Sequence, residues 1–228
     1  MKLGILFSGG KDSCLAMHKV MQEKGNEVVC LISLISSNPE SYMFHTPNIH
    51  IVEMQAEAIG LPLVKVETAG VKEKELLDLQ KAIEYAKKLY SIEGIVTGAI
   101  ASQYQASRIQ KICDKLGLKC INPLWHMDQI EELHELIREG FEVIISGVFA
   151  YGLEKEMLGK QIDEPMIAKL KRLQEIMKIN PSGEGGEIET TTLDAPFFKK
   201  RIIVTEHDTD FKDNSGIFKI TEAELVGK

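Results

Sequence analysis

Short apolar runs alternate with helical patterns through the first half of the chain, and this alternation constrains the fold more than any other feature. Predicted strands lie at 3–7, 27–34, 62–66, 93–99 and 118–122. The first predicted helix follows the first strand and ends near residue 24, and three more span 48–60, 73–91 and 102–116. The run 27–34 is almost entirely apolar or β-branched, as in a strand buried on both faces. Strands separated by helices of this length predict an α/β fold, with a five-stranded parallel sheet and helices on both faces.

The pattern changes near Pro123. Predicted helices lie at 128–139 and 163–178, and predicted strands lie at 141–150, 201–207 and 216–225, the last two antiparallel. The glycine- and glutamate-rich segment 180–196 is expected to be a loop, and loops of this length are often functional. We therefore expect two domains: residues 1–122, and a smaller C-terminal α+β subdomain over 123–228 that binds substrate.

Composition narrows the class of protein. The 228 residues are 44% hydrophobic and 27% charged, which is typical of a soluble globular protein. No apolar run reaches the ~20 residues of a membrane span, and the N-terminus lacks a signal-peptide pattern. These features predict a cytoplasmic protein without a membrane partner. The net charge of −7 argues against broad binding to nucleic acid. Abundant Lys and Glu favour a thermophilic source.

The four cysteines do not suggest a metal site. None is part of a C-x-x-C pair, and no His/Cys cluster has the spacing of a zinc site. Each cysteine lies in an apolar or helical context, where a buried free thiol is the ordinary state. We expect neither zinc nor disulfides.

A polar hexapeptide links the first strand to the first helix. It consists of Ser8, Gly9, Gly10, Lys11, Asp12 and Ser13. It is not a Walker A loop, and it lacks the G-x-G-x-x-G of dinucleotide sites. Glycines let backbone N–H groups close around an anion at a helix N-terminus, Lys11 adds positive charge and the serines add hydroxyl donors. Asp12 suits Mg²⁺ or a helix cap. A phosphate site is therefore predicted, with a plain capped turn as the alternative.

Two more polar segments, 33–37 and 97–102, follow predicted strands. In a parallel sheet the carboxyl ends of the strands share one edge, where ligands bind near the switch point of the strand order. We expect these segments and the hexapeptide to form one site.

The hexapeptide resembles the PP-loop of the N-type ATP pyrophosphatases, a superfamily that includes GMP, asparagine and NAD synthetases. The resemblance implies an adenine nucleotide alpha-hydrolase-like fold and cleavage of ATP to AMP and pyrophosphate, with Mg²⁺. It also implies that residues 8–13 bind ATP, that Lys11 and Asp12 are catalytic and that Asp12 holds the metal.

Three further segments, 42–63, 97–125 and 183–198, are similar to the signature blocks of the diphthine–ammonia ligase family. Together with the hexapeptide they extend the similarity over essentially the whole chain. The family implies ATP-dependent amidation of diphthine on translation elongation factor 2, a step of diphthamide biosynthesis that passes through an acyl-adenylate. The sequence offers no glutaminase nucleophile, so the expected nitrogen source is ammonium. A homodimer is compatible with the sequence.

Site residues are assigned by this resemblance. The assigned nucleotide-binding residues beyond the hexapeptide are His45, Gly98 and Arg108. The assigned substrate-binding residues are Gln103, Tyr104, Glu184, Gly185, Gly186, Glu187, Glu189 and Thr190, with Glu187 as a catalytic carboxylate. Each has a plain structural alternative: a surface histidine, a turn glycine, a helix N-terminus, a solvated arginine or a solvated acidic loop.

Two other functions stay open. A PP-loop enzyme that modifies tRNA would share the hexapeptide, but the missing C-x-x-C pair and the negative charge argue against it. A non-catalytic ATP sensor would not need a loop that grips pyrophosphate. Release of pyrophosphate separates the sensor from both enzymes.

Overall fold

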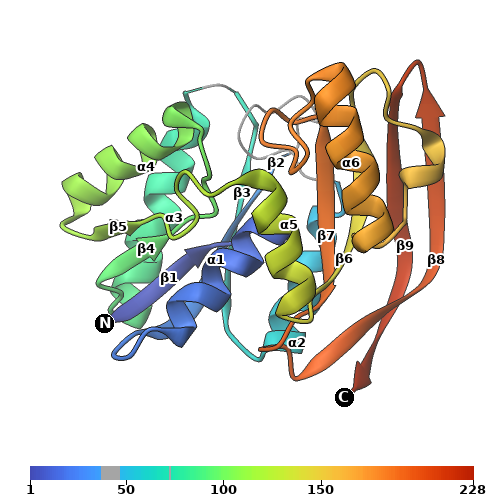
Figure 1. Cartoon of the computed structure of the whole chain (residues 1–228). Coiled ribbons are helices and arrows are strands. Elements are labelled where there is room, and N and C mark those ends of the chain that lie inside the picture. The colour runs from blue at the N-terminus through green and yellow to red at the C-terminus, as the bar shows by residue number, and fades with distance from the viewer. Residues whose placement is uncertain (37–46, 72) are drawn as a thin grey trace.

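Five parallel strands form the central sheet of the N-terminal half (Figure 1). The computed structural model describes residues 1–36, 47–71 and 73–228. The sheet order is β3-β2-β1-β4-β5, built from β1 (Lys2–Leu6), β2 (Glu27–Ser36), β3 (Leu63–Thr68), β4 (Gly94–Val96) and β5 (Lys119–Ile121). This arrangement confirms the predicted α/β fold. The order reverses between β1 and β4, so the loops that follow these two strands flank the switch point where such sheets bind ligands.

Helices cover both faces of this sheet, as the alternation predicts. One apolar cluster packs α3 (Glu75–Tyr90) and α4 (Gln103–Leu116) against β2 and β4. On the opposite face, two helices pack against β1 and β2: α1 (Lys11–Gln22) and α2 (Val52–Ile59). The 3-10 turn η1 (Ile49–Ile51) directly precedes α2. In the part of the chain that the structure describes, no helix is long and apolar enough to cross a membrane.

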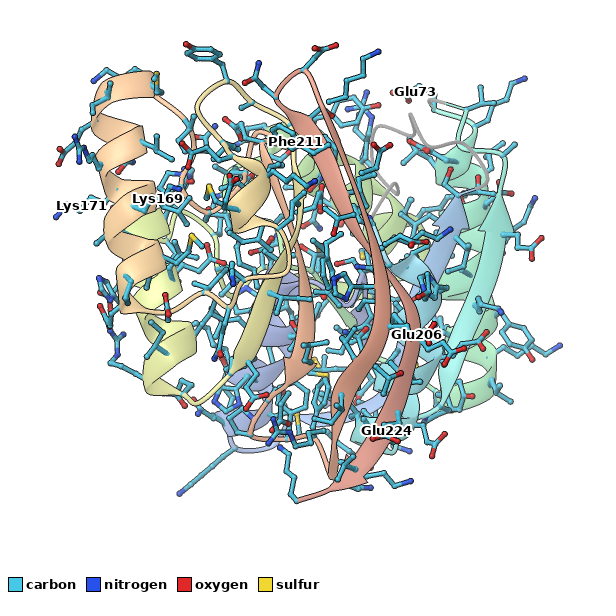
Figure 2. All side chains as sticks on the ribbon, turned by 90° about the vertical axis from the view of Figure 1, so that its right-hand side faces the viewer. Glu73, Lys169, Lys171, Glu206, Phe211 and Glu224 are labelled. Carbon is cyan, nitrogen blue, oxygen red and sulfur yellow. The ribbon has the colours of Figure 1, made fainter. Side chains whose placement is uncertain are left out.

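A second, antiparallel sheet forms the C-terminal half. Its order is β7-β6-β9-β8, built from β6 (Glu142–Val148), β7 (Ile188–Asp194), β8 (Lys200–Lys212) and β9 (Ser215–Gly227). The helices of this half are α5 (Gln129–Arg138) and α6 (Glu164–Met177), and the 3-10 turn η2 (Lys155–Met157) follows β6. The long β8–β9 hairpin lies at the outer edge, where Glu206 and Glu224 are exposed (Figure 2). The predicted antiparallel pair is therefore confirmed.

The expectation that 180–196 is a loop was wrong for its second half, which forms β7. Threonines 190–192 supply the β-branched side chains that favour a strand, and all three are buried. Their hydroxyls made the segment look like a surface loop in the sequence. The first half is irregular, and the backbone at Gly183 and Gly186 has a positive φ that suits glycine.

The two halves share one hydrophobic core. A continuous cluster of buried residues runs from Leu15 of α1 through Leu133 of α5 to Ile145 of β6 and Ile220 of β9. Leu15, Leu133, Ile145 and Ile220 are fully buried. The C-terminal sheet therefore packs on the helical layer of the N-terminal sheet, and this packing fixes the position of β7 relative to β1.

Asn48, just before η1, joins the two halves through hydrogen bonds. It is buried, and its left-handed backbone (φ 62°) is one that asparagine tolerates well. Its side-chain Nδ2 donates to the Phe218 carbonyl oxygen (2.9 Å), and its Oδ1 accepts from the Ile220 N–H (2.8 Å). These bonds satisfy backbone groups of β9.

We predict that Asn48→Ala lowers the free energy of unfolding by about 2–3 kcal/mol, because two buried backbone groups of β9 lose their partners. Urea denaturation at neutral pH measures the change. Asn26→Ala, which removes only local bonds to Val20 and Glu23, is the control and should cost less than about 1 kcal/mol. Equal losses in the two variants would contradict the prediction.

Candidate functional site

Hydrogen bonds with residues of α2 and β7 fix the glycine loop that follows β1. Gly9 has a φ of +77°, and a Cβ there would lie 2.1 Å from the Gln55 Oε1 atom. The Gln55 Nε2 atom donates to the carbonyl oxygens of Gly9 (2.9 Å) and Thr192 (2.8 Å), while the Thr192 N–H donates to the Gly9 oxygen (2.9 Å). The Lys11 N–H donates to Thr190 Oγ1 at 3.1 Å. A residue from each half therefore fixes the shape of the loop.

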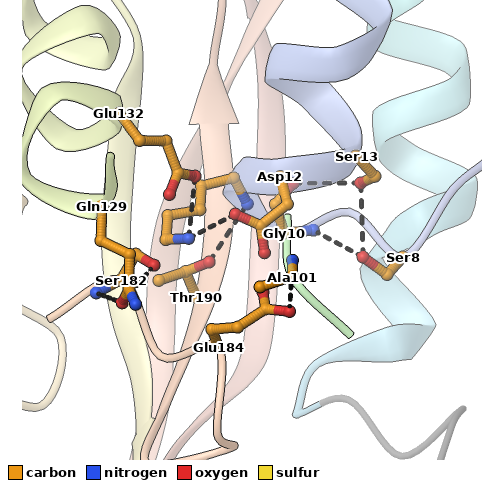
Figure 3. A network of polar contacts seen from close by, with 11 residues as sticks. Ser8, Gly10, Asp12, Ser13, Ala101, Gln129, Glu132, Ser182, Glu184 and Thr190 are labelled. Atoms are coloured by element: carbon orange, nitrogen blue, oxygen red, sulfur yellow. Dashed lines mark hydrogen bonds and ion pairs between the residues drawn. The ribbon is translucent and has the colours of Figure 1, made fainter. Parts of the chain in front are cut away.

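A cavity of about 360 Å³ opens at the carboxyl ends of β1 and β4 (Figure 3). Three segments supply most of its polar lining: the loop that runs into α1, the loop that joins β4 to α4, and the segment 182–190 from the C-terminal half. The sequence-predicted residues in the lining are Ser8, Gly10, Asp12, Ser13, Gly98, Glu184, Gly185, Gly186, Glu189 and Thr190. The structure thus brings most of the predicted site into one cavity.

Gly98 permits a very close approach between two of these segments. A Cβ on Gly98 would lie 2.8 Å from the Asp12 carbonyl carbon and 2.8 Å from the Ser13 nitrogen. These are backbone atoms, so no side-chain rotation would relieve the clash. The β4–α4 loop therefore rests directly on the first turn of α1, and Gly98 is explained by this contact within the protein.

Lys11 lies behind the cavity wall and is 1% exposed. Its ammonium forms ion pairs with Asp12 and with the buried Glu132 of α5, the second at 3.0 Å. Burial alone would lower the pKa of Lys11, but the two carboxylates outweigh it and raise that pKa. Burial also raises the pKa of Glu132 well above its ordinary range, although Lys11 opposes the shift.

Glu132 was missed by the sequence analysis, although its position carries a signal. It occupies the same helix face as Leu133 and Leu136, both buried. A carboxylate on the apolar face of an amphipathic helix needs a buried partner, which here is Lys11.

The three glutamates of the segment 182–190 have different surroundings. Glu184 accepts a hydrogen bond from the Ala101 N–H (2.9 Å), and burial raises its pKa. Glu189 lines the cavity, where burial raises its pKa to about 8, with the Asp12 carboxylate adding to the shift. Glu187 does not line the cavity; its carboxylate accepts bonds from the Asn180 N–H (3.2 Å) and Nδ2 (2.7 Å).

The predicted residues of α4 lie outside the cavity. The Arg108 guanidinium pairs with Glu73 (2.6 Å) and lies 3.4 Å above the Tyr104 ring, whose hydroxyl donates to Glu73 (2.8 Å). Gln103 is exposed at the start of the helix. The α4 residues that do line the cavity are Gln105 and Ile109, one turn apart, and the sequence analysis missed both. His45 lies outside the described residues.

The lining can accommodate a nucleotide with a divalent cation. The N-cap residue Gly10 has no side chain to cap α1, and Thr190 Oγ1 accepts only from the Lys11 N–H. The remaining N–H groups of the first turn suit an anion, as at helix-terminus phosphate sites. Within residues 1–36, 47–71 and 73–228, no group of three side chains forms a complete metal site. Mg²⁺ in nucleotide sites typically takes one or two carboxylates and completes its shell with phosphates and water. Asp12, whose side chain is 39% exposed, is placed to be such a ligand.

The fold and the cavity define an α/β protein with a glycine loop at a helix N-terminus, which faces a segment of the second, C-terminal half across one cavity. Comparisons with known proteins give the family. Residues 1–120 match the diphthamide synthase N-terminal domain, and residues 128–226 match the diphthamide synthase C-terminal domain. The chain belongs to the diphthamide synthase family.

Individual relatives agree with the family models. The chain is 37% identical to the diphthine–ammonia ligase of Rattus norvegicus, over 90% of this chain and 83% of that protein. It is 36% identical to the human protein of the same name over the same shares of the two chains. In Schizosaccharomyces pombe the similar protein is longer: 36% identity covers 91% of this chain but 37% of that one.

The raised pKa of Glu189 predicts a pH-dependent cost to stability. Its ordinary pKa is near 4.5 and the folded value is about 8, so the folded state loses stability as the pH rises through this interval. Glu189→Gln removes the ionisation. We expect it to raise the free energy of unfolding on the order of 2 kcal/mol at pH 9, and by little at pH 5. Denaturant unfolding at both pH values tests this, and a pH-independent difference would contradict it.

Proposed function

We propose that this chain is a diphthine–ammonia ligase, which amidates the diphthine of translation elongation factor 2 with ammonium and ATP. The observation that carries the proposal is the shared cavity, in which the glycine loop faces the carboxylate-bearing segment 182–190. The first element suits the phosphates of ATP, and the second suits a cationic substrate. The family models and the names of the relatives support the same function.

The reaction has two steps in this proposal. The substrate carboxylate attacks the α-phosphate of ATP, which gives an acyl-adenylate and releases pyrophosphate. Ammonium then supplies the nitrogen, and AMP leaves as the amide forms. A carboxylate is a poor acyl donor, whereas the adenylate provides a good leaving group.

The residues of the loop have separate roles. The N–H groups at the start of α1 and the hydroxyls of Ser8 and Ser13 bind the phosphates. Asp12 faces the cavity and takes the Mg²⁺ that accompanies ATP. Lys11 does not line the cavity; its ammonium orients the Asp12 carboxylate and adds positive potential behind the loop. Glu132 holds Lys11 in this position.

The direct test combines the protein with Mg-ATP, ammonium and elongation factor 2 that carries diphthine. We expect AMP and pyrophosphate in equal amounts, and a mass change in the modified histidine peptide that corresponds to conversion of acid to amide. AMP formed without amidation, or only with added tRNA, would indicate a tRNA-modifying PP-loop enzyme. Binding of ATP without turnover would indicate a sensor.

We predict that Asp12→Asn lowers AMP formation at least about a hundredfold, because it removes the carboxylate that would hold the Mg²⁺ of Mg-ATP. The fold should persist, since Asp12 is partly exposed. Lys19→Ala is the control, because Lys19 also lies on α1 and pairs with Glu135 of α5 but does not line the cavity. It should leave AMP formation unchanged. Normal turnover in Asp12→Asn would contradict the assignment of the loop.

Lys11→Ala should also abolish AMP formation, but it leaves Glu132 buried beside an empty space. Loss of one partner of a buried ion pair typically costs about 3–5 kcal/mol. The double variant Lys11→Ala/Glu132→Gln keeps the core neutral and tests the role of Lys11 in a folded protein. Circular dichroism checks the fold, and a double variant that is folded and fully active would exclude Lys11 from catalysis.

A further inference from the structure

Of the carboxylates that line the cavity, Glu189 is the one with no partner among the described residues. Among the described residues, no hydrogen bond or ion pair engages its side chain, whereas Glu184 is bonded to Ala101 and Glu187 to Asn180. The charged groups that face Glu189 are Asp12 and Lys11, both from the start of α1. Lys11 is already paired with two carboxylates. Among the described residues, Glu189 therefore faces no free cation.

We propose that the Glu189 carboxylate binds ammonium and accepts a proton from it, so that ammonia attacks the acyl-adenylate. This inference rests on the proposed function and names the base for its second step. It assigns that role to Glu189 in place of Glu187, whose carboxylate points into the loop and braces Asn180.

The proton and electron balance of the step is complete. An N–H bond of ammonium breaks and its proton moves to a Glu189 oxygen, which frees the nitrogen lone pair. That pair forms the C–N bond, and the C–O bond to AMP breaks with its electrons on the phosphate oxygen. The nitrogen loses its second surplus proton to solvent, so one ammonium and one acyl-adenylate give one amide, AMP and two protons.

The environment of Glu189 suits this role. A general base works best when its pKa lies near the working pH, and burial holds the pKa of Glu189 at about 8. A cation beside the carboxylate favours its ionised form, so arrival of ammonium itself prepares the base. A water-exposed carboxylate would ionise fully but would be too weak a base to deprotonate ammonium.

The test separates adenylation from amide formation in the full protein, with diphthine-bearing elongation factor 2 and Mg-ATP. Hydroxylamine, which is uncharged at neutral pH, replaces ammonium in one arm and gives a hydroxamate. In Glu189→Gln we expect pyrophosphate exchange with ATP to stay within about threefold of wild type. Amidation with ammonium should fall at least about a hundredfold. Hydroxamate formation should be retained within about tenfold, because the nucleophile needs no prior deprotonation.

Three comparison variants separate a role as base at Glu189 from a general effect of removing a carboxylate. Glu206→Gln, at an exposed position on β8, should behave as wild type in every assay. Glu187→Gln should keep the wild-type ratio of the ammonium and hydroxylamine rates, even where a loosened loop lowers both. Glu189→Asp, which keeps a carboxylate, should restore part of the ammonium-dependent rate.

Two outcomes would overturn the inference. Equal loss with ammonium and hydroxylamine would show that Glu189 does not act as the base. Loss of pyrophosphate exchange in Glu189→Gln would place the residue in the ATP or metal site. Absence of exchange in the wild-type protein is a different result, since it would refute the proposed function itself.

Discussion

The site depends on one buried cation and the carboxylates that hold it. Lys11 lies between Asp12 on its own helix and Glu132 on α5, with its side chain and that of Glu132 out of contact with water. A buried charge is tolerated only when it is paired, so neither half of the protein can place these groups alone. The same contact ties α1 to α5 and brings the glycine loop against β7. The conformation of the glycine loop therefore depends on the packing of the second half against the first.

Local patterns in the sequence were enough to predict the N-terminal sheet, because hydrophobic periodicity and strand–helix alternation are properties of neighbouring residues. The hexapeptide was found for the same reason. Glu132, Gln55 and Gln105 were missed because each reaches the site through a contact between distant segments. Strand β7 was taken for a loop because its buried threonines are polar, and the sheet that buries them lies elsewhere in the sequence.

The three glutamates of the segment 182–190 show that a sequence motif alone does not tell which of its residues has which role. In the sequence they look equivalent, and Glu187 was assigned as the catalytic carboxylate on the family resemblance. In the fold Glu184 and Glu189 both line the cavity, but Glu184 accepts a hydrogen bond from the β4–α4 loop and Glu189 has no partner among the described residues, while Glu187 is bonded to Asn180 within its own loop. Which glutamate has which role depends on the turns at Gly183 and Gly186 and on the start of β7.

The charges of the cavity also constrain how ATP binds. Asp12, Glu184 and Glu189 all line it, and the positive charge of Lys11 is already balanced by Asp12 and Glu132. A triphosphate that entered without a cation would be repelled by the Asp12 carboxylate and would favour the neutral form of Glu189, whose pKa is already raised. The N–H groups at the start of α1 would offset this repulsion only locally. In the proposed reaction, Mg²⁺ held by Asp12 would offset that repulsion, and Glu189 would remain the lining carboxylate that has no partner among the described residues. A small cation such as ammonium would then be drawn to Glu189, which lies near the start of α1, and in the proposed reaction it would attack the acyl-adenylate from there.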